Sequence, residues 1–169
     1  ADCIIAVSQH TKNVIVEHYD IAPDRVMVVH NGINHEEYRR ELPIALGNVR
    51  AQGKKIVLFV GRITIQKGAD YFIKVAKRVL EYDPNVLFII SDSGDMEHQI
   101  IRLAADMGLG ERVIFAGFVR GDELLKLYRA ADLYVMPSVS EPFGLTALEA
   151  LANGTPILVS KQSGVSEVL

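Results

Sequence analysis

The chain has 169 residues, of which 49% are hydrophobic and 23% charged, and its formal net charge is −3. This length suits one domain with a substantial core, and the slightly acidic balance argues against a nucleic-acid partner. The single cysteine, Cys3, excludes an internal disulfide and favours a reducing, cytoplasmic location, while no signal peptide and no apolar run of the ~18 residues of a membrane helix is visible.

Seven short apolar runs, most of them rich in Val and Ile, have the pattern of strands that are buried on both faces. In chain order they are CIIAV (3–7), VMVV (26–29), IVLFV (56–60), VLFII (86–90), VIFA (113–116), LYVM (133–136) and PILVS (156–160).

Amphipathic segments lie between the later runs. Residues 68–82, 95–107 and 121–131 carry apolar side chains at helical spacing, and a shorter helix is predicted to begin near Gly144 or Leu145. Strands and helices in strict alternation predict an α/β fold, a doubly wound, Rossmann-like parallel sheet with helices on both faces. Such sheets bind ligands beyond the carboxyl ends of their strands, so the loops that follow the strands are the places to search.

The polar segment 39–53 lacks a sustained period and is predicted to be a linker. Residues 1–38 would then belong with a preceding domain, and residues 54–169 would form most of a second one. The chain begins inside a strand without an initiator Met and stops in GVSEVL, which has the pattern of an opening helix. We therefore expect a piece of a longer protein, incomplete at both ends.

The loop GRITIQKGAD follows the strand 56–60 and brings two cations, Arg62 and Lys67, next to a helix expected to start near Gly68. A helix N-terminus offers free N–H groups and the positive end of a dipole. Together these groups favour a diphosphate, with Arg supplying a planar fork and Lys a point charge. The alternative is that both are solvated surface cations. The glycine spacing fits neither a P-loop nor a dinucleotide fingerprint.

The loop PSVSEPFGLTALEAL follows the strand 133–136. Pro142 is excluded from a helix interior, and Gly144 allows a tight backbone at the helix start. The N–H groups of Phe143, Gly144 and Leu145 would then point out of the helix N-terminus towards an anion.

Two glutamates flank this helix start. Glu149 lies in the second turn of a helix that is apolar on almost every face, so its carboxylate needs hydrogen-bond donors, which sugar hydroxyls can supply. The alternative is an ion pair with an Arg or Lys from another element. Glu141 lies just before the helix, where an acid is also favoured by the helix dipole alone.

These stretches carry a resemblance. The segments VGRITIQKG, ERVIFAGFV and AADLYVMPSVSEPFGLTALEALANGTPILVSKQSGVSEVL resemble the C-terminal, nucleotide-sugar-binding domain of retaining GT-B glycosyltransferases, the group 1 family that includes glycogen, sucrose and mannosyl synthases. Residues 1–38, with AVS and HNGIN, resemble the end of the acceptor-side domain and the crossover. The resemblance thus spans the whole chain, and its two glutamates eight residues apart are specific.

The resemblance implies catalytic roles for three side chains. Arg62 and Lys67, in the loop that begins at Gly61, would hold the diphosphate of the donor and stabilise the leaving group. Glu141 would contact hydroxyls of the transferred sugar, without acting as an assigned nucleophile. Glu149 would bind the ribose hydroxyls.

The resemblance also implies further contacts to the donor. The backbone amides of Phe143, Gly144 and Leu145 would support the phosphate and the sugar, and Phe118 and Val119 would lie along the base. No metal and no cofactor beyond the nucleoside-diphosphate sugar is expected, and the five histidines are scattered.

The sequence departs from the family in SDSGDM, where Asp92 stands at the first glycine of an expected Gly-x-Gly. This places a carboxylate near a loop that should face an anionic donor. A second departure, His30 where proline is common before Asn-Gly, looks minor.

The sequence therefore predicts a fragment of a retaining, hexosyltransferase-type enzyme of carbohydrate biosynthesis. The full protein would transfer a sugar from a nucleotide to a hydroxyl of a glycan, sugar or lipid bound through the missing domain, with peripheral membrane association left open. The alternative is a non-catalytic nucleotide-sugar-binding module, which Asp92 slightly favours. A sugar-nucleotide epimerase is disfavoured by both glutamates with Phe-Gly-Leu.

Overall fold

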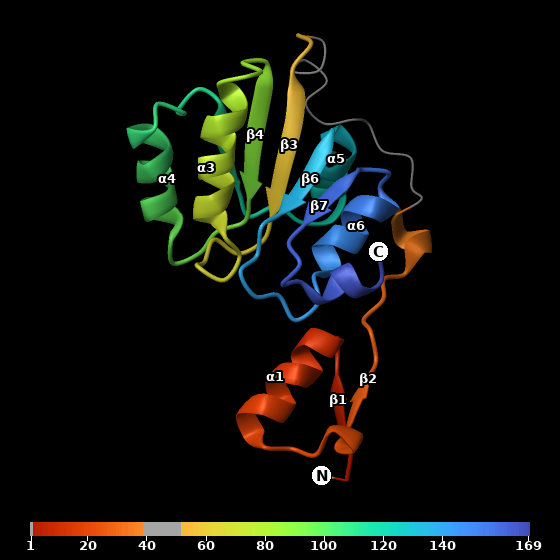
Figure 1. The fold of residues 1–169 in the computed structure, drawn as a ribbon. Helices are drawn as coiled ribbons and strands as arrows, with labels where there is room; N and C mark the ends of the chain where they lie inside the picture. The colour runs from red at the N-terminus through yellow and green to blue at the C-terminus, as the bar shows by residue number, and fades with distance from the viewer. Residues whose placement is uncertain (1, 39–51) are drawn as a thin grey trace.

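A computed structural model describes residues 2–38 and 52–169 of the chain. Its centre is a five-stranded parallel sheet with the strand order β5-β4-β3-β6-β7 (Figure 1). The strands are β3 (Lys55–Val60), β4 (Val86–Ser91), β5 (Val113–Gly117), β6 (Leu133–Met136) and β7 (Ile157–Val159). The order reverses direction between β3 and β6, as in doubly wound sheets, so the predicted fold class is confirmed.

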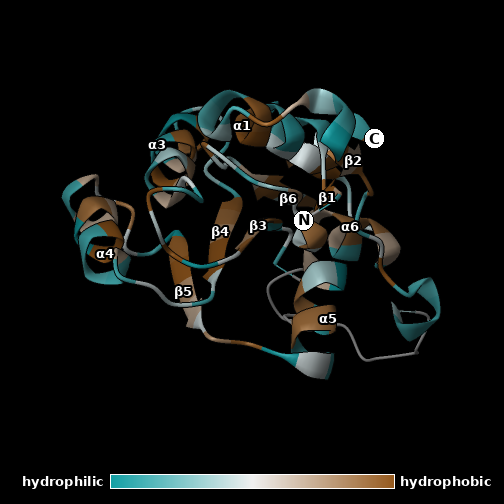
Figure 2. Cartoon of the chain, turned by 90° about the horizontal axis from the view of Figure 1, so that it is seen from below, coloured by the Kyte–Doolittle hydropathy of each residue, from teal (hydrophilic) through white to brown (hydrophobic). Residues whose placement is uncertain are grey.

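Helices cover both faces of this sheet. The helices α3 (Ala69–Leu80) and α4 (Glu97–Asp106) lie on one side, and α5 (Gly121–Ala130) and α6 (Leu145–Ala152) lie on the other. Figure 2 shows the hydrophobic strands β3, β4 and β5 running between α3 and α4 on one side and α5 on the other.

The alternation of side chains along β3 explains the two layers. Ile56 and Leu58 point into the core under α5 and α6, whereas Phe59 points into the core under α3 and α4. In the second core Phe59, Phe72 and Phe88 form a chain of rings, with centroids 5.4 and 5.6 Å apart. Because each face of the strand is buried, its sequence is a continuous apolar run instead of an alternating one.

The first residues form a separate small unit, which we call the N-terminal unit (residues 2–30). It contains β1 (Ile4–Ala6), α1 (Gln9–Tyr19), η1 (Pro23–Arg25) and β2 (Val26–Val28), and β1 pairs with β2 in parallel. The following 3₁₀ helix η2 (His35–Tyr38) packs against α6 instead, and the Arg129 guanidinium donates to the Tyr38 carbonyl at 2.7 Å. Figure 1 shows the paired strands and α1 beyond the carboxyl ends of the five-stranded sheet. The unit therefore lies at the edge where such sheets bind ligands.

All seven predicted strands are present, and the helices predicted at 68–82, 95–107 and 121–131 and near Leu145 are present in slightly shorter form. The opening helix expected in GVSEVL is the 3₁₀ helix η3 (Gly164–Glu167). Most of the predicted linker 39–53 lies outside the described residues. None of the helices in the described part of the chain is long and apolar enough to cross a membrane.

Candidate functional site

A pocket of about 490 Å³ opens at the carboxyl ends of β3, β4 and β6. It is lined by Phe59, Val60, Gly61, Arg62, Thr64, Gln66, Lys67, Asp92, Met136, Ser138, Glu141, Pro142 and Thr146. We call it the sheet-edge pocket. It brings together Gly61, Arg62, Lys67 and Glu141, which belong to two loops far apart in the chain.

The backbone of the loop after β3 is held from both sides. The N–H of Gly61 donates to the Ser91 carbonyl at 3.1 Å, and the N–H of Ile63 donates to the Ser93 carbonyl at 3.0 Å. The loop ends at Gly68, whose φ of 71° caps α3 in the left-handed region. A Cβ on Gly68 would lie 2.3 Å from the carbonyl oxygen of Pro137, so only glycine lets the two loops approach this closely.

Arg62 and Lys67 differ in their surroundings. The Arg62 side chain is exposed and makes no ion pair with the described residues, so its guanidinium is available to a ligand. The Lys67 ammonium forms an ion pair with Glu141. Lys67 keeps further N–H donors, because an ammonium group has three.

Glu141 is the most constrained charged group of the pocket. Only 6% of the residue is exposed, and its backbone N–H and carbonyl bond Gln162 and Gly164 at 3.1 and 3.0 Å. A carboxylate this buried requires a compensating charge, which Lys67 supplies. This ion pair was not expected from the sequence, because its partners are 74 residues apart.

The start of α6 is built as the sequence predicts. Gly144 has a φ of 107°, and a Cβ there would meet the Met136 side chain at 2.7 Å. Phe143 is buried and its ring lies 5.9 Å from that of His30, whereas Leu145 is 40% exposed. The backbone at the N-terminus of α6 thus lies beside Glu141 and Pro142 at the pocket wall.

Glu149 lines a different pocket, of about 230 Å³, together with Glu37, Tyr38, Gly121, Asp122, Leu124 and Leu125. Its carboxylate accepts a hydrogen bond from the Tyr128 hydroxyl at 2.9 Å. Burial, with Tyr134 and Glu149 nearby, raises the pKa of Tyr128 well above its ordinary value. Partial burial and then the charge of Glu149 also raise the pKa of Tyr38. Tyrosine hydroxyls, which the sequence analysis did not consider, therefore provide donors for this carboxylate.

Phe118 and Val119 line a third pocket, of about 400 Å³, with Ala116, Arg120, Glu123 and Leu127. Phe118 is 57% exposed, and the Arg120 guanidinium lies 4.2 Å from its ring centroid. An exposed ring next to a cation offers a flat surface for stacking. The side chains predicted to contact the donor thus line three separate pockets instead of one.

Asp92 lines the sheet-edge pocket and has a φ of 121°, a value that non-glycine residues rarely adopt. Its N–H donates to the Gly117 carbonyl at 2.8 Å, and its Oδ1 accepts the N–H of Ser93 at 2.7 Å. The backbone therefore keeps a glycine-like conformation at the position where the family pattern has glycine, and the carboxylate shares a pocket with Arg62 and Lys67.

Sequence reasoning did not single out Ser138, Thr146 or Gln66 as pocket residues. The Ser138 hydroxyl is buried without a hydrogen-bond partner among the described residues, while the Thr146 hydroxyl lies 2.7 Å from that of Tyr134. The position of Ser138 directly after Pro137 at the end of β6 was the available signal. No group of three or more potential metal ligands occurs in residues 2–38 and 52–169.

The parallel sheet, with helices on both faces and a charged pocket at its carboxyl edge, defines an α/β domain of the doubly wound type. A family model described as glycosyl transferases group 1 matches residues 47–169, and one described as glycosyltransferase family 4 matches residues 1–37. The chain belongs to the glycosyl transferases group 1 family.

Among curated proteins, an uncharacterized glycosyltransferase of Methanocaldococcus jannaschii is 41% identical over 98% of this chain and 44% of its own length. A D-inositol 3-phosphate glycosyltransferase of Nocardia farcinica is 38% identical over 98% of this chain and 39% of its own length. The chain therefore spans less than half the length of these relatives.

Solved structures agree on the fold. HepE of Anabaena, in a crystal structure with UDP and glucose, matches with a TM-score of 0.85 and 24% identity over 100% of this chain and 47% of its own. The sucrose-phosphate synthase of Thermosynechococcus elongatus matches with a TM-score of 0.78 and 28% identity over 99% of this chain and 42% of its own.

Proposed function

We propose that the chain supplies the donor-binding half of a retaining glycosyltransferase that moves a hexose from a nucleoside diphosphate to a hydroxyl. The observation that carries this proposal is the sheet-edge pocket, where an exposed Arg62, a partly buried Lys67 and a buried Glu141 converge. Relatives named as glycosyltransferases and the HepE complex with UDP and glucose support a nucleotide-sugar donor.

The three side chains divide the work by chemistry. The Arg62 fork binds the diphosphate, and Lys67 adds a second positive charge, so both stabilise the negative charge that develops as the glycosidic bond breaks. Glu141 orients Lys67 through their ion pair, and its remaining lone pairs accept a hydrogen bond from a hydroxyl of the transferred sugar. No protein nucleophile is assigned.

The outer pockets take the rest of the donor in this proposal. Glu149 accepts hydrogen bonds from the ribose hydroxyls, in addition to the one from the Tyr128 hydroxyl. Phe118 and Val119 pack along the base. The amides of residues 143–145 support the phosphate and the sugar. In this proposal the hydroxyl acceptor binds on the side of the N-terminal unit, and the protein works in the cytoplasm.

A non-catalytic nucleotide-sugar-binding module is the second candidate, and Asp92 is the observation that favours it. The Asp92 carboxylate would repel the diphosphate of a bound nucleotide sugar. A transfer reaction that needs a firmly held diphosphate would therefore be slowed. The two candidates share the ligand and differ only in whether the full protein transfers the sugar.

The test is a thermal-shift panel of nucleoside diphosphates and their sugars. A ligand that binds only the folded chain, at about 100 times its Kd, adds ~2.7 kcal/mol to stability. Arg62→Ala is expected to weaken a nucleoside diphosphate about 10–150-fold and the bare nucleoside little, because a charge-assisted hydrogen bond is lost. Arg102→Ala, on the outer face of α4, is the control. Equal losses for nucleoside and diphosphate would show that Arg62 does not bind phosphate.

A further inference from the structure

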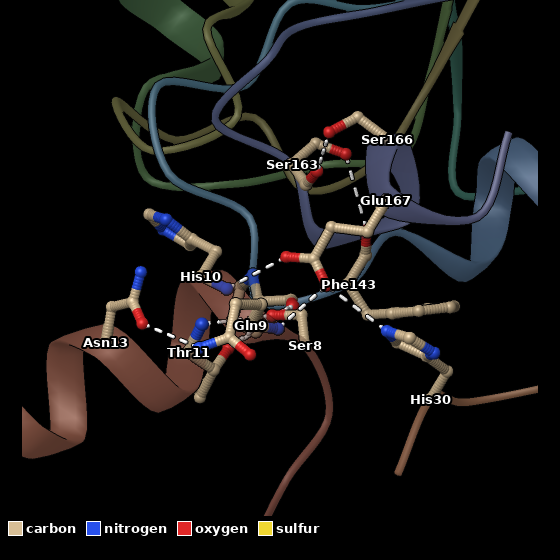
Figure 3. A network of polar contacts seen from close by, with 11 residues as sticks. Ser8, Gln9, His10, Thr11, Asn13, His30, Phe143, Ser163, Ser166 and Glu167 are labelled. Atoms are coloured by element: carbon tan, nitrogen blue, oxygen red, sulfur yellow. Dashed lines mark hydrogen bonds and ion pairs between the residues drawn. The ribbon is translucent and has the colours of Figure 1, made fainter. Parts of the chain in front are cut away.

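The carboxylate of Glu167, in η3, lies at the N-terminus of α1 (Figure 3). One of its oxygens accepts the N–H of Gln9 at 2.7 Å, and the other accepts the N–H of His10 at 2.8 Å. The His30 ring lies 3.2 Å from the same carboxylate. A single side chain thus contacts both the first turn of α1 and the segment that follows β2.

A second set of contacts joins the same two parts of the chain. The buried Ser8 hydroxyl donates to the carbonyl of Pro142 at 2.6 Å and also accepts the N–H of Thr11 at 3.0 Å as the cap of α1. Ser8 therefore fixes the first turn of α1 to the loop 141–144, which forms one wall of the sheet-edge pocket.

The segment that carries Glu167 is itself bonded to that loop. The N–H of Gly164 donates to the Glu141 carbonyl at 3.0 Å, and the N–H of Val165 donates to the Phe143 carbonyl at 2.7 Å. The packing is tight, because a Cβ on Gly164 would lie 2.3 Å from the Pro142 carbonyl oxygen and 2.5 Å from the Ser8 Cβ. Three segments, α1, the loop 141–144 and η3, thus hold one another.

We propose that Glu167 is a positioning residue that clamps the N-terminal unit against the loop 141–144 and thereby sets the position of Glu141 and Pro142 in the pocket wall. The charge of one carboxylate is spread over two helix-terminal N–H groups, an arrangement in which each hydrogen bond is strengthened by the charge and by the helix dipole. Because the clamp contacts the pocket wall, occupancy of the pocket and docking of the N-terminal unit are coupled, and coupling between two equilibria is reciprocal. This second statement rests on the proposed nucleotide site.

The test compares Glu167→Gln with the unmodified chain by amide hydrogen exchange. A carboxamide has one acceptor oxygen, so it satisfies one of the two N–H groups and presents its NH₂ to the other. We expect the amides of Gln9 and His10 to exchange about tenfold faster, the factor that corresponds to 1.4 kcal/mol. The amides of Gly164 and Val165, which bond the loop and not Glu167, should also exchange faster.

The amides of Gly164 and Val165 separate positioning from simple capping. Faster exchange at Gln9 and His10 alone, with unchanged exchange at Gly164 and Val165, would show that Glu167 only caps α1 and would overturn the proposal. Asp83→Asn is the matched control, because Asp83 also pairs with a cation, Lys55, and accepts a backbone N–H, but at the amino end of the sheet. It should leave all four amides unchanged.

Binding of UDP and GDP supplies the second measurement. Glu167→Gln should weaken whichever nucleotide binds by about three- to tenfold, and that nucleotide should slow exchange at Gln9 and His10 in the unmodified chain. Unchanged affinity would refute the coupling. If the unmodified chain binds no member of the nucleoside diphosphate panel, the proposed function fails, while exchange at Gly164 and Val165 still decides whether Glu167 positions the loop 141–144. Should Glu167→Gln not fold, Glu167→Asp shortens the side chain while keeping its charge, and the same four amides are followed.

Discussion

At the residue scale, the ion pair between Lys67 and Glu141 sets the chemistry of the pocket. It lets a carboxylate stay buried next to a site for an anionic ligand, because the ammonium cancels most of its charge. The same pairing reduces the positive field that Lys67 offers to a diphosphate. Arg62, which has no such partner among the described residues, is therefore the stronger phosphate ligand of the two.

Glu141→Gln tests this division of roles. Removing the negative charge leaves Lys67 free to attract phosphate, so we expect a nucleoside diphosphate to bind up to about tenfold more tightly, while the preference for the complete nucleotide sugar falls. Calorimetric titration of both ligands measures the change. Glu81→Gln, which releases Arg78 from an exposed ion pair at the carboxyl end of α3, serves as the control and should alter neither affinity. A parallel weakening of both ligands would mean that Glu141 only maintains the fold of the loop.

Asp92→Gly is the second change at this scale. Two like charges about 8 Å apart repel by ~2 kcal/mol at an effective dielectric constant of ~20, and salt reduces this repulsion further. We therefore expect the variant to bind a nucleoside diphosphate more tightly, and the gain to be larger at low than at high ionic strength. Glycine also suits the φ of 121° better than Asp. Titrations of both chains with the nucleoside diphosphate at two salt concentrations measure this difference. An unchanged affinity at both concentrations would contradict the electrostatic explanation.

At the scale of elements, the carboxyl edge of the sheet depends on loops that approach one another more closely than side chains allow. Gly68 lies against Pro137, and a Cβ on Gly94 would lie 2.3 Å from the Ile63 carbonyl oxygen. These contacts bring the loop after β3 against the loops after β6 and β4. Glycines at these points are therefore structural requirements of the pocket and not merely flexible positions.

Gly68→Ala should destabilise the chain by at least about 1–3 kcal/mol, since the new methyl group meets backbone and the φ of 71° disfavours alanine. Chemical denaturation followed by circular dichroism measures the loss. Gly110→Ala is the matched control, because a methyl group there would have no other atom within 4 Å and the φ of Gly110 is not positive. A Gly68→Ala chain as stable as the control would show that the two loops can separate freely.

The strands and most helices could be predicted from the sequence, whereas the side-chain contacts between distant residues could not. The seven strands were predicted from short apolar runs. Burial on both faces explains these runs in β3, β4 and β6, whereas Ile5, Met27 and Leu158 on the outer strands are exposed. The helix α1 was not predicted, since its sequence QHTKNVIVEHY buries no residue and has no apolar stripe, although Ser8 was a usable N-cap signal. The bonds from Tyr128 to Glu149 and from Lys67 to Glu141 join residues far apart in the chain, so no local pattern encodes them.

At the scale of the whole molecule, two family segments meet through few but specific contacts. Glu167 and Ser8 contribute the polar part, and the rings of His30 and Phe143 pack beside them. The exposed apolar side chains of Ile5 and Met27 on β1 and β2 take no part in this contact. We therefore expect ionisation of the Glu167 carboxylate to contribute to docking of the N-terminal unit, beside the neutral contacts of Ser8 and Phe143.

This dependence predicts how stability changes with pH. Partial burial by itself would raise the pKa of Glu167, but the N–H groups of Gln9 and His10 and the ring of His30 outweigh it and lower the pKa below its ordinary 4.5. A carboxyl group whose pKa is lower in the folded chain contributes stability that is fully present above its unfolded pKa and is lost as pH falls through the folded pKa. The contribution of Glu167 should therefore be present at pH 7, begin to fall near pH 4.5 and be lost as the pH drops through the lowered pKa of the folded chain.

The measurement is the difference in unfolding free energy between the unmodified chain and Glu167→Gln, taken by urea denaturation at several pH values. The difference should be largest near neutral pH and shrink towards zero in acid, because a protonated Glu167 resembles the amide in charge. Among the described residues, His30 is the ionisable side chain that contacts this carboxylate. The series is therefore repeated with His30→Gln, and the loss of stability in acid should persist because the two backbone N–H groups remain. A difference that stays constant from neutral to acid pH would mean that the carboxylate charge does not hold the N-terminal unit in place.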